Sequence, residues 1–321
     1  MLCSGVLGSL SAQAIAGTLG SKTMGRPKIK IVRSQSSIAN PRAFTLIELL
    51  VVISIIALLL AILLPTLQLV KRQAQVIVCQ SNQNQWGKIL TMYAEDSQGY
   101  LPSTPIGAIW FMRGSAPSED VSCKPDQYNN VRTEGIACCP VAVKPTDRGG
   151  DGHLIDDGPS YTPQWRVRVK WGGTFRAWQI IEPSPPFLCS YGFNGWLLDS
   201  LFSIVKPRSP YQRSLDVLSL RKRGKIPALM DCVLPWGHCG PNAEPPSSET
   251  NYGSDIKCFC INRHDGYVNG LFLDWSVRKI GLKELWTLKW DKQYDTAGPW
   301  TRAGGVQTDD WPEWMRNFRD Y

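Results

Sequence analysis

The sequence predicts an α+β protein in which one long N-terminal helix precedes a mostly antiparallel β-sheet head with irregular loops. Three observations predict it. A predominantly apolar run covers residues 44–64, a segment with helical spacing of apolar residues follows it, and after residue 100 short alternating segments are separated by frequent Pro and Gly. With 321 residues, 43% of them hydrophobic, the chain can bury a core of one or two domains.

The apolar run has the length and composition of a membrane span. Phe44 to Leu64 comprises 21 residues, and every residue from Leu49 to Leu64 except Ser54 is apolar. As a helix the run would be about 32 Å long, enough to cross a bilayer core of about 30 Å. We therefore predict a transmembrane helix over 44–65. Glu48 lies near its start, where an acid is costly in lipid and usually functional.

The residues around Glu48 form a recognisable motif. Ala43-Phe44-Thr45-Leu46-Ile47-Glu48-Leu49 resembles the prepilin-type cleavage and methylation signal of type IV pilins and type II secretion pseudopilins. The resemblance implies that prepilin peptidase cuts between Ala43 and Phe44 and that the new Phe44 amine is N-methylated. Glu48 would be the fifth mature residue, pairing with the amine of a neighbouring subunit, and Pro65 the twenty-second, where many pilins carry a proline. The family usually has Gly at the position of Ala43.

The same resemblance implies a pilin-like fold and a function. The chain would be a pseudopilin-like structural subunit of a type II secretion or type IV pilus-like assembly, polymerising with itself or other pseudopilins through its N-terminal helix. One alternative is a membrane-tethered, non-polymerising envelope protein whose aromatic head binds glycan or another ligand. A tethered hydrolase using His264 is a third. The arrangement of Phe44, Glu48 and Pro65 favours the first, because a plain anchor does not need an acid at that position.

Charge predicts the orientation in the membrane. Residues 1–43 contain six bases and no acid, which leaves 29 bases and 27 acids in the rest of the chain. The basic pI is therefore a property of this leader, and no nucleic-acid partner is indicated. Basic flanks stay in the cytoplasm, so we expect a single pass through the inner membrane, in contact with its lipid, and a head in the periplasm or envelope space. Met24 is an alternative start, in which case residues 1–23 are not translated.

The helix is expected to continue as an amphipathic segment over 66–99. Apolar residues recur at helical spacing, whereas the stretch 80–85 is entirely polar. Gly99 is expected to close the helix in a left-handed conformation. The recurring apolar residues are Leu67, Val70, Ala74, Ile77, Ile89 and Tyr93.

A second resemblance covers this segment and a late hairpin. Cys79-x-x-Asn82-x-x-Gln85-x-Gly87 resembles a motif of planctomycete-type pseudopilin-like proteins, and His264 with Asp274 resembles their His-x9-Asp-Gly signature. Strand, turn and strand fit residues 267–273 and 276–280. Trp275 replaces the expected Gly, so the turn must be of another type or carry strain.

Further elements of the head, 100–281, can be predicted. Residues 165–171 alternate apolar and basic and should pair with 174–178 as a hairpin, and 225–231 reads as another strand. Residues 282–321 form an aromatic-rich C-terminal extension with five tryptophans. Its end is expected to be a helix capped by Asp309 or Asp310, with the aromatic face packed on the sheet or, alternatively, used for docking.

The sequence contains none of the common enzyme motifs, and we expect no enzymatic activity and no cofactor. His238 and Cys239, with Cys232, Cys258, Cys260 and His264, have spacings that match no zinc pattern. Eight cysteines in residues 123–260 predict at least one disulfide in an oxidising space. Calcium is a weak candidate at a Gly-rich loop whose acids are Asp147, Asp151, Asp156 and Asp157.

Overall fold

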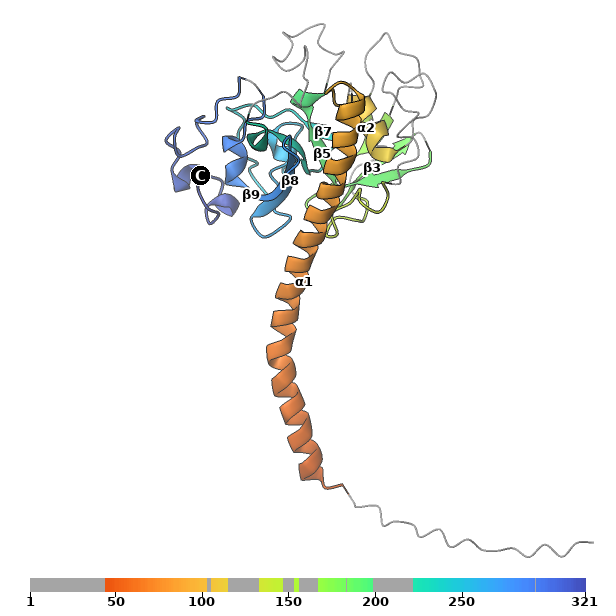
Figure 1. The fold of residues 1–321 in the computed structure, drawn as a ribbon. Coiled ribbons are helices and arrows are strands. Elements are labelled where there is room, and N and C mark those ends of the chain that lie inside the picture. The colour runs from red at the N-terminus through yellow and green to blue at the C-terminus, as the bar shows by residue number, and fades with distance from the viewer. Residues whose placement is uncertain are drawn as a thin grey trace, which may run out of the picture. The chain divides into compact units, whose positions relative to one another are not determined.

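The computed structural model describes residues 44–102, 105–114, 133–146, 153–155, 167–182, 184–198, 222–291 and 293–321. The chain divides into two compact units, Met1–Leu58 and Leu59–Tyr321. The fold class is confirmed: a long apolar N-terminal helix is followed by a head built on antiparallel and mixed β-sheets (Figure 1).

Helix α1, Leu46–Asp96, is one continuous element of 51 residues that includes Pro65. It ends where the sequence predicts. The Ser97 amide donates to the Tyr93 carbonyl at 2.9 Å, and the Gly99 amide reaches back to the Ala94 carbonyl at 2.6 Å. Gly99 has φ +86°, the left-handed conformation that a residue without Cβ adopts at little cost.

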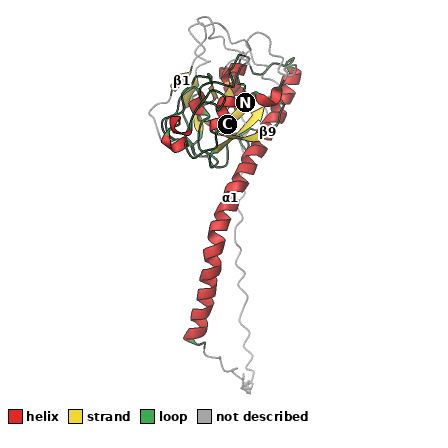
Figure 2. Cartoon of the chain, turned by 90° about the vertical axis from the view of Figure 1, so that its left-hand side faces the viewer, coloured by secondary structure: helices red, strands yellow, loops and turns green. Residues whose placement is uncertain are grey.

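The head holds two sheets of short strands joined by loops (Figure 2). One has the order β1-β2-β3-β4 and is antiparallel throughout: His153–Ile155, Val167–Lys170, Trp178–Glu182 and Phe187–Cys189. The other has the order β7-β5-β6-β8-β9 and is antiparallel except for the pair β5–β7: Trp236–Gly237, Tyr191–Asn194, Pro227–Asp231, Tyr267–Phe272 and Val277–Gly281.

The predicted late hairpin is confirmed. Strands β8 and β9 pair in register from Tyr267 with Gly281 to Leu271 with Val277. Trp275 occupies the turn with φ +66°, so a large aromatic residue takes the left-handed position that Gly would fill. Its amide donates to the Phe272 carbonyl at 2.8 Å, and its side chain packs against the hydrophobic core.

The earlier hairpin is correct in its first strand and wrong in its return. Strand β2 pairs with β3, but β3 begins at Trp178 and not at Thr174. Gly173 and Arg176 instead form an isolated bridge with reciprocal backbone hydrogen bonds of 3.0 and 3.2 Å. This tight turn uses the residues that had been expected to extend the strand.

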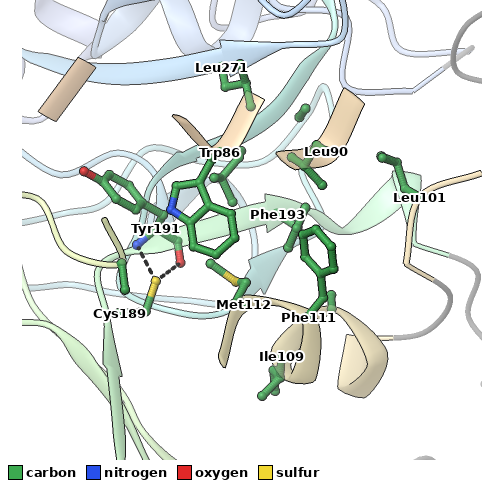
Figure 3. Packing of buried hydrophobic residues seen from close by; sticks show 14 of the residues in the cluster. Trp86, Leu90, Leu101, Ile109, Phe111, Met112, Cys189, Tyr191, Phe193 and Leu271 are labelled. Carbon is green, nitrogen blue, oxygen red and sulfur yellow. Dashed lines mark hydrogen bonds between the residues drawn. The ribbon is translucent and has the colours of Figure 1, made fainter. Parts of the chain in front are cut away.

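A first hydrophobic cluster lies where the C-terminal part of α1 meets α2, Pro105–Arg113, and strand β5 (Figure 3). Trp86 of α1 is fully buried, and its indole N–H donates to the Ile136 carbonyl at 3.0 Å. Phe111 of α2 packs edge-on against Tyr93, with ring centroids 5.0 Å apart. The cluster also includes Leu90, Ile109, Met112, Tyr191, Phe193 and Leu271.

The face of α1 that docks on the head differs from the one predicted. Leu67, Val70, Ala74 and Ile77 are exposed, and the expected apolar stripe is therefore wrong over that stretch. The docked face instead runs through the entirely polar stretch 80–85. Its buried residues recur at intervals of three and four: Val76, Cys79, Asn82, Gln83, Trp86, Gly87, Leu90, Tyr93 and Ala94.

A second cluster joins the far side of the five-stranded sheet to the C-terminal residues. Trp286, Trp290 and Trp311 are buried in it, and the buried Lys283 amine donates to the Asp320 carboxylate at 2.7 Å. In the part of the head that the structure describes, no tryptophan is exposed. The aromatic residues near the C-terminus therefore pack inward.

Two further expectations need correction. The C-terminal segment is not an α-helix. It contains two short 3-10 turns, Thr308–Asp310 and Glu313–Met315, the first capped by Gln307, whose amide donates to Asp310 at 2.7 Å. The expected disulfide is also not found among the described cysteines, which are all free thiols. Burial within the cores accounts for most of them, and Cys123 lies outside the described residues.

Candidate functional site

The start of α1 is closed by a reciprocal pair of hydrogen bonds between Thr45 and Glu48. The Thr45 amide and hydroxyl donate to Glu48 Oε2 at 2.8 and 2.9 Å, and the Glu48 amide donates to the Thr45 hydroxyl at 3.2 Å. This is a capping box, which satisfies amides that the first turn of a helix leaves without partners. Glu48 therefore has a local structural role within one chain, beside any role between chains.

The N-terminal half of α1 is left exposed by the residues that the structure describes. Every residue from Phe44 to Ala74 is exposed, and α1 is the one helix among the described residues that is long and apolar enough to cross a membrane. Two hydroxyl groups in this stretch are satisfied within the helix. The Ser54 hydroxyl donates to the Val51 carbonyl at 2.7 Å, and the Thr66 hydroxyl, next to Pro65, donates to the Leu63 carbonyl at 2.8 Å. The segment is thus suited to lipid or to other apolar helices.

A second site is a buried polar cluster formed by Cys79, Cys139, Asp231 and His264. One ligating atom from each lies within 4.8 Å of all the others, and all four residues are buried. His264 Nε2 lies 3.3 Å from Asp231 Oδ2 and 3.4 Å from Cys139 Sγ. Cys79 Sγ lies 3.6 and 3.7 Å from the two Asp231 oxygens.

Four separate segments bring these side chains together. Cys79 lies on the docked face of α1 and Asp231 at the end of β6. Cys139 lies in the loop after α2, where its amide donates to the Ser190 hydroxyl at 2.6 Å. His264 is held by a tight turn in which Gly266, at φ +87°, donates its amide to the Asn262 side chain at 2.7 Å.

Asp231 is the electrostatic centre of this cluster. Its Oδ1 accepts from Arg263 Nη1 at 3.0 Å, and its Oδ2 accepts from the Asn269 amide at 2.8 Å. Burial raises the pKa of Asp231, but the adjacent His264 and Arg263 outweigh burial and bring that pKa to about 2. Burial alone would lower the pKa of His264, but the Asp231 carboxylate outweighs burial and raises that pKa to about 9. Burial raises the pKa of the Cys79 thiol well above its ordinary value.

Arg263 anchors the cluster to the surrounding backbone. Besides its bond to Asp231, its guanidinium donates to the carbonyls of Thr174 and Ser190 at 2.7 Å each and of Gly173 at 3.1 Å. Both charged side chains of the pair have no exposed surface. A planar, five-donor group suits this arrangement, in which acceptors approach from several directions.

The structure places the motif residues in different roles. Asn82 donates to the Cys138 carbonyl at 2.9 Å, and Gly87 lets Leu271 pack against the helix, because a Cβ there would lie 3.0 Å from Leu271 Cδ1. Gln85 is exposed. Asp274 closes the β8–β9 turn by accepting from the Ser276 amide and hydroxyl at 3.0 and 2.6 Å, away from the buried cluster.

Among the described candidates, His238 does not join the buried cluster. His238 stacks edge-on against Trp196 at 5.1 Å and is not part of the group that contains His264. Ala43 and the calcium candidates Asp147, Asp151, Asp156 and Asp157 lie outside the described residues. Sequence reasoning missed Cys139, Asp231 and Arg263. The adjacency of Arg263 to the motif residue His264 was the one available signal.

Comparison with known proteins identifies the N-terminal segment. Residues 38–64 match the family described as "Prokaryotic N-terminal methylation motif", so the chain carries this prepilin-type motif. It is similar to the "Type IV wide pilus major component PilA4" of Thermus thermophilus, with 43% identity over 61 residues in the N-terminal part. The match covers 19% of this chain and 47% of the relative, so the chain spans about half of the relative's length. No solved structure matches the chain.

Proposed function

We propose that the chain is a non-enzymatic structural subunit, a pilin or pseudopilin, that assembles with other copies or related subunits through α1. The methylation motif at residues 38–64 carries this proposal. The fully exposed apolar surface of residues 44–74 supports it, because this surface needs lipid before assembly and other helices after it. Cleavage between Ala43 and Phe44 by prepilin peptidase, methylation of Phe44 and anchoring in the inner membrane with the head in the envelope space follow from the same proposal.

The tethered, glycan-binding alternative receives less support. Aromatic side chains that bind sugars or protein partners must be accessible, yet every tryptophan that the structure describes in the head is buried or partly buried. The aromatic residues of 282–321 serve as core instead. The proposal covers a subunit of a type II secretion pseudopilus and a subunit of a type IV pilus-like assembly alike.

Processing is tested first. The full chain is isolated from membranes and its N-terminus is read by mass spectrometry. We expect a mature chain that begins at N-methylated Phe44. Residues 1–43 still attached to the membrane protein, or a cut at another site, would contradict the proposal.

Assembly is tested by separating the two roles of Glu48. Glu48→Gln removes the charge but keeps an oxygen that can accept from Thr45, so the helix cap is retained. Thr45→Ala removes the hydroxyl of the cap and keeps the charge. A photo-reactive residue at Leu58, which is exposed, reports contacts between subunits in membranes.

We expect Glu48→Gln to insert and to be cleaved normally but to lose the subunit crosslinks, and Thr45→Ala to retain them. Glu48→Asp should retain part of them, because its charge remains on a shorter side chain. Equal crosslinking in the wild type and in Glu48→Gln would show that the charge has no role in assembly and would favour the tethered protein.

A further inference from the structure

The buried cluster of Cys79, Cys139, Asp231 and His264 has the composition of a metal site. Two thiols, an imidazole and a carboxylate are the ligand types that Zn²⁺ takes in proteins. Such a set is too soft for calcium or magnesium, which prefer oxygen ligands alone. We propose that this cluster binds one Zn²⁺ ion, which fastens α1 to the head. The inference is independent of the proposed assembly function.

Three of the six distances between ligand atoms match a tetrahedral ion. With Zn–S bonds of about 2.3 Å and Zn–N and Zn–O bonds of about 2.0–2.2 Å, tetrahedral ligand atoms lie about 3.3–3.8 Å from one another. The separations here are 3.3 Å between His264 and Asp231, 3.4 Å between His264 and Cys139, and 3.6 Å between Cys79 and Asp231. The remaining three pairs of ligating atoms lie within 4.8 Å, so small shifts of side chains would bring all four onto one ion.

The groups around the four ligands suit a metal as well. Asp231 is oriented by Arg263 and by the Asn269 amide, and the Tyr191 hydroxyl lies 3.4 Å from Cys79 Sγ. Such outer partners fix ligand orientation in metal sites. On binding, both thiols and the His264 imidazolium release one proton each to water, so that His264 ligates as a neutral imidazole. Two thiolates and the carboxylate then balance the zinc ion and the Arg263 guanidinium, so the buried site carries no net charge.

The burial of all four ligands indicates a structural rather than a catalytic zinc ion. All four ligands are protein side chains, and none is exposed. Catalytic zinc sites keep one position for water or substrate, whereas structural sites are closed by four protein ligands. The competing explanation is a hydrogen-bonded group of thiols, an imidazole and a carboxylate. Thiols are weak donors and weak acceptors, so this explanation gives little reason for two of them to converge here.

The site joins segments that are distant in the sequence. Cys79 belongs to α1, Cys139 to the loop after α2, Asp231 to β6 and His264 to the turn before β8. An ion at their centre would tie the helix that carries the methylation motif to both the loop region and the five-stranded sheet.

The test uses the full chain, purified in detergent without chelators. Elemental analysis should find about one zinc ion per chain, and thiol titration of the unreduced, denatured protein should find Cys79 and Cys139 free. After removal of zinc, added Co²⁺ should give the intense visible absorption of a tetrahedral cobalt ion with thiolate ligands. These measurements on the wild type do not depend on whether any variant folds.

Variants then assign the ligands. Cys79→Ser and Cys139→Ser should lose the zinc and the cobalt–thiolate absorption. Cys260→Ser, which alters an equally buried thiol in the other core cluster, should keep both. A wild type that contains no zinc and takes up neither zinc nor cobalt would overturn the proposal. So would a disulfide between Cys79 and Cys139, or full zinc content in both ligand variants.

Discussion

Replacing Arg263 by Met should destabilise the head severely, because it breaks a fully buried ion pair. Met keeps much of the volume of the side chain and removes its charge and all its donors. Asp231 would remain in the core with the Asn269 amide and His264 but without its guanidinium partner. The altered residue lies in the loop before β8 and far along the chain from the apolar half of α1, so insertion in the membrane should be unaffected.

The magnitude follows from what the structure leaves uncompensated. Removing one member of a buried pair costs about 3–5 kcal/mol. Two of the carbonyls that Arg263 contacts keep another donor: the Cys232 amide donates to the Ser190 carbonyl, and the Arg176 amide donates to the Gly173 carbonyl. Losing the guanidinium therefore costs less at these two carbonyls. We therefore expect the free energy of unfolding to fall by at least about 3 kcal/mol, a large fraction of the 5–15 kcal/mol of an ordinary domain.

The assay is urea unfolding of the full chain in detergent, followed by tryptophan fluorescence, with the metal content of each sample measured. The matched control is Arg168→Met. Its ion pair with Glu182 is as short, at 2.9 Å, but the two side chains are 31% and 64% exposed, so its loss should cost about 0–1 kcal/mol. Adding Asp231→Asn to Arg263→Met should restore part of the lost stability, because the buried carboxylate that lost its guanidinium partner is then replaced by a neutral amide. Equal midpoints for the Arg263 and Arg168 variants would refute the reasoning.

Substitutions at three further positions, with Gly240→Ala as a control, test the packing around α1 and β5 in the same unfolding assay. Gly192→Ala should cost about 1–3 kcal/mol or more, because a Cβ there would lie 2.3 Å from the Leu234 carbonyl oxygen, whereas Gly240→Ala, with nothing within 4 Å, should be neutral. Gly87→Val should cost about 1–3 kcal/mol and Gly87→Ala less than about 1 kcal/mol, since Ala gains helix propensity and displaces only the end of the Leu271 side chain. Trp86→Phe should cost about 1–3 kcal/mol, because the Ile136 carbonyl loses its buried donor. An unchanged free energy of unfolding for Gly192→Ala, Gly87→Val or Trp86→Phe would contradict the packing described here.

Local signals predicted the parts of the fold that depend on local sequence. The apolar run, the left-handed end at Gly99 and the hairpin around Trp275 all depend on residues within a few positions of one another. The docked face of α1 could not be predicted this way. Asn82 and Gln83 look solvent-facing in a polar stretch, and they are buried because the Cys138 and Asn269 carbonyls on distant segments accept their hydrogen bonds.

The buried cluster shows the same limit more strongly. Cys79 and His264 were visible as motif residues, but their partners Cys139 and Asp231 lie in segments with no distinctive spacing. Pattern reasoning about zinc relies on ligands that are close in sequence, and here they are far apart. The cluster exists only because the loop after α2, strand β6 and the turn before β8 all pack against one face of a helix.

Apolar residues are usually buried and polar residues exposed, but within this chain the two halves of α1 show the opposite. The most apolar half is exposed along its whole length, whereas the polar half supplies the buried face. The polar half has its partners in its own head, through Asn82, Gln83 and Trp86, and is complete in a single subunit. The apolar half can lower its free energy only by contact with lipid or with another helix. Substitutions in the docked half should accordingly alter the stability of the head, and those in the exposed half should alter insertion and assembly while leaving the head folded.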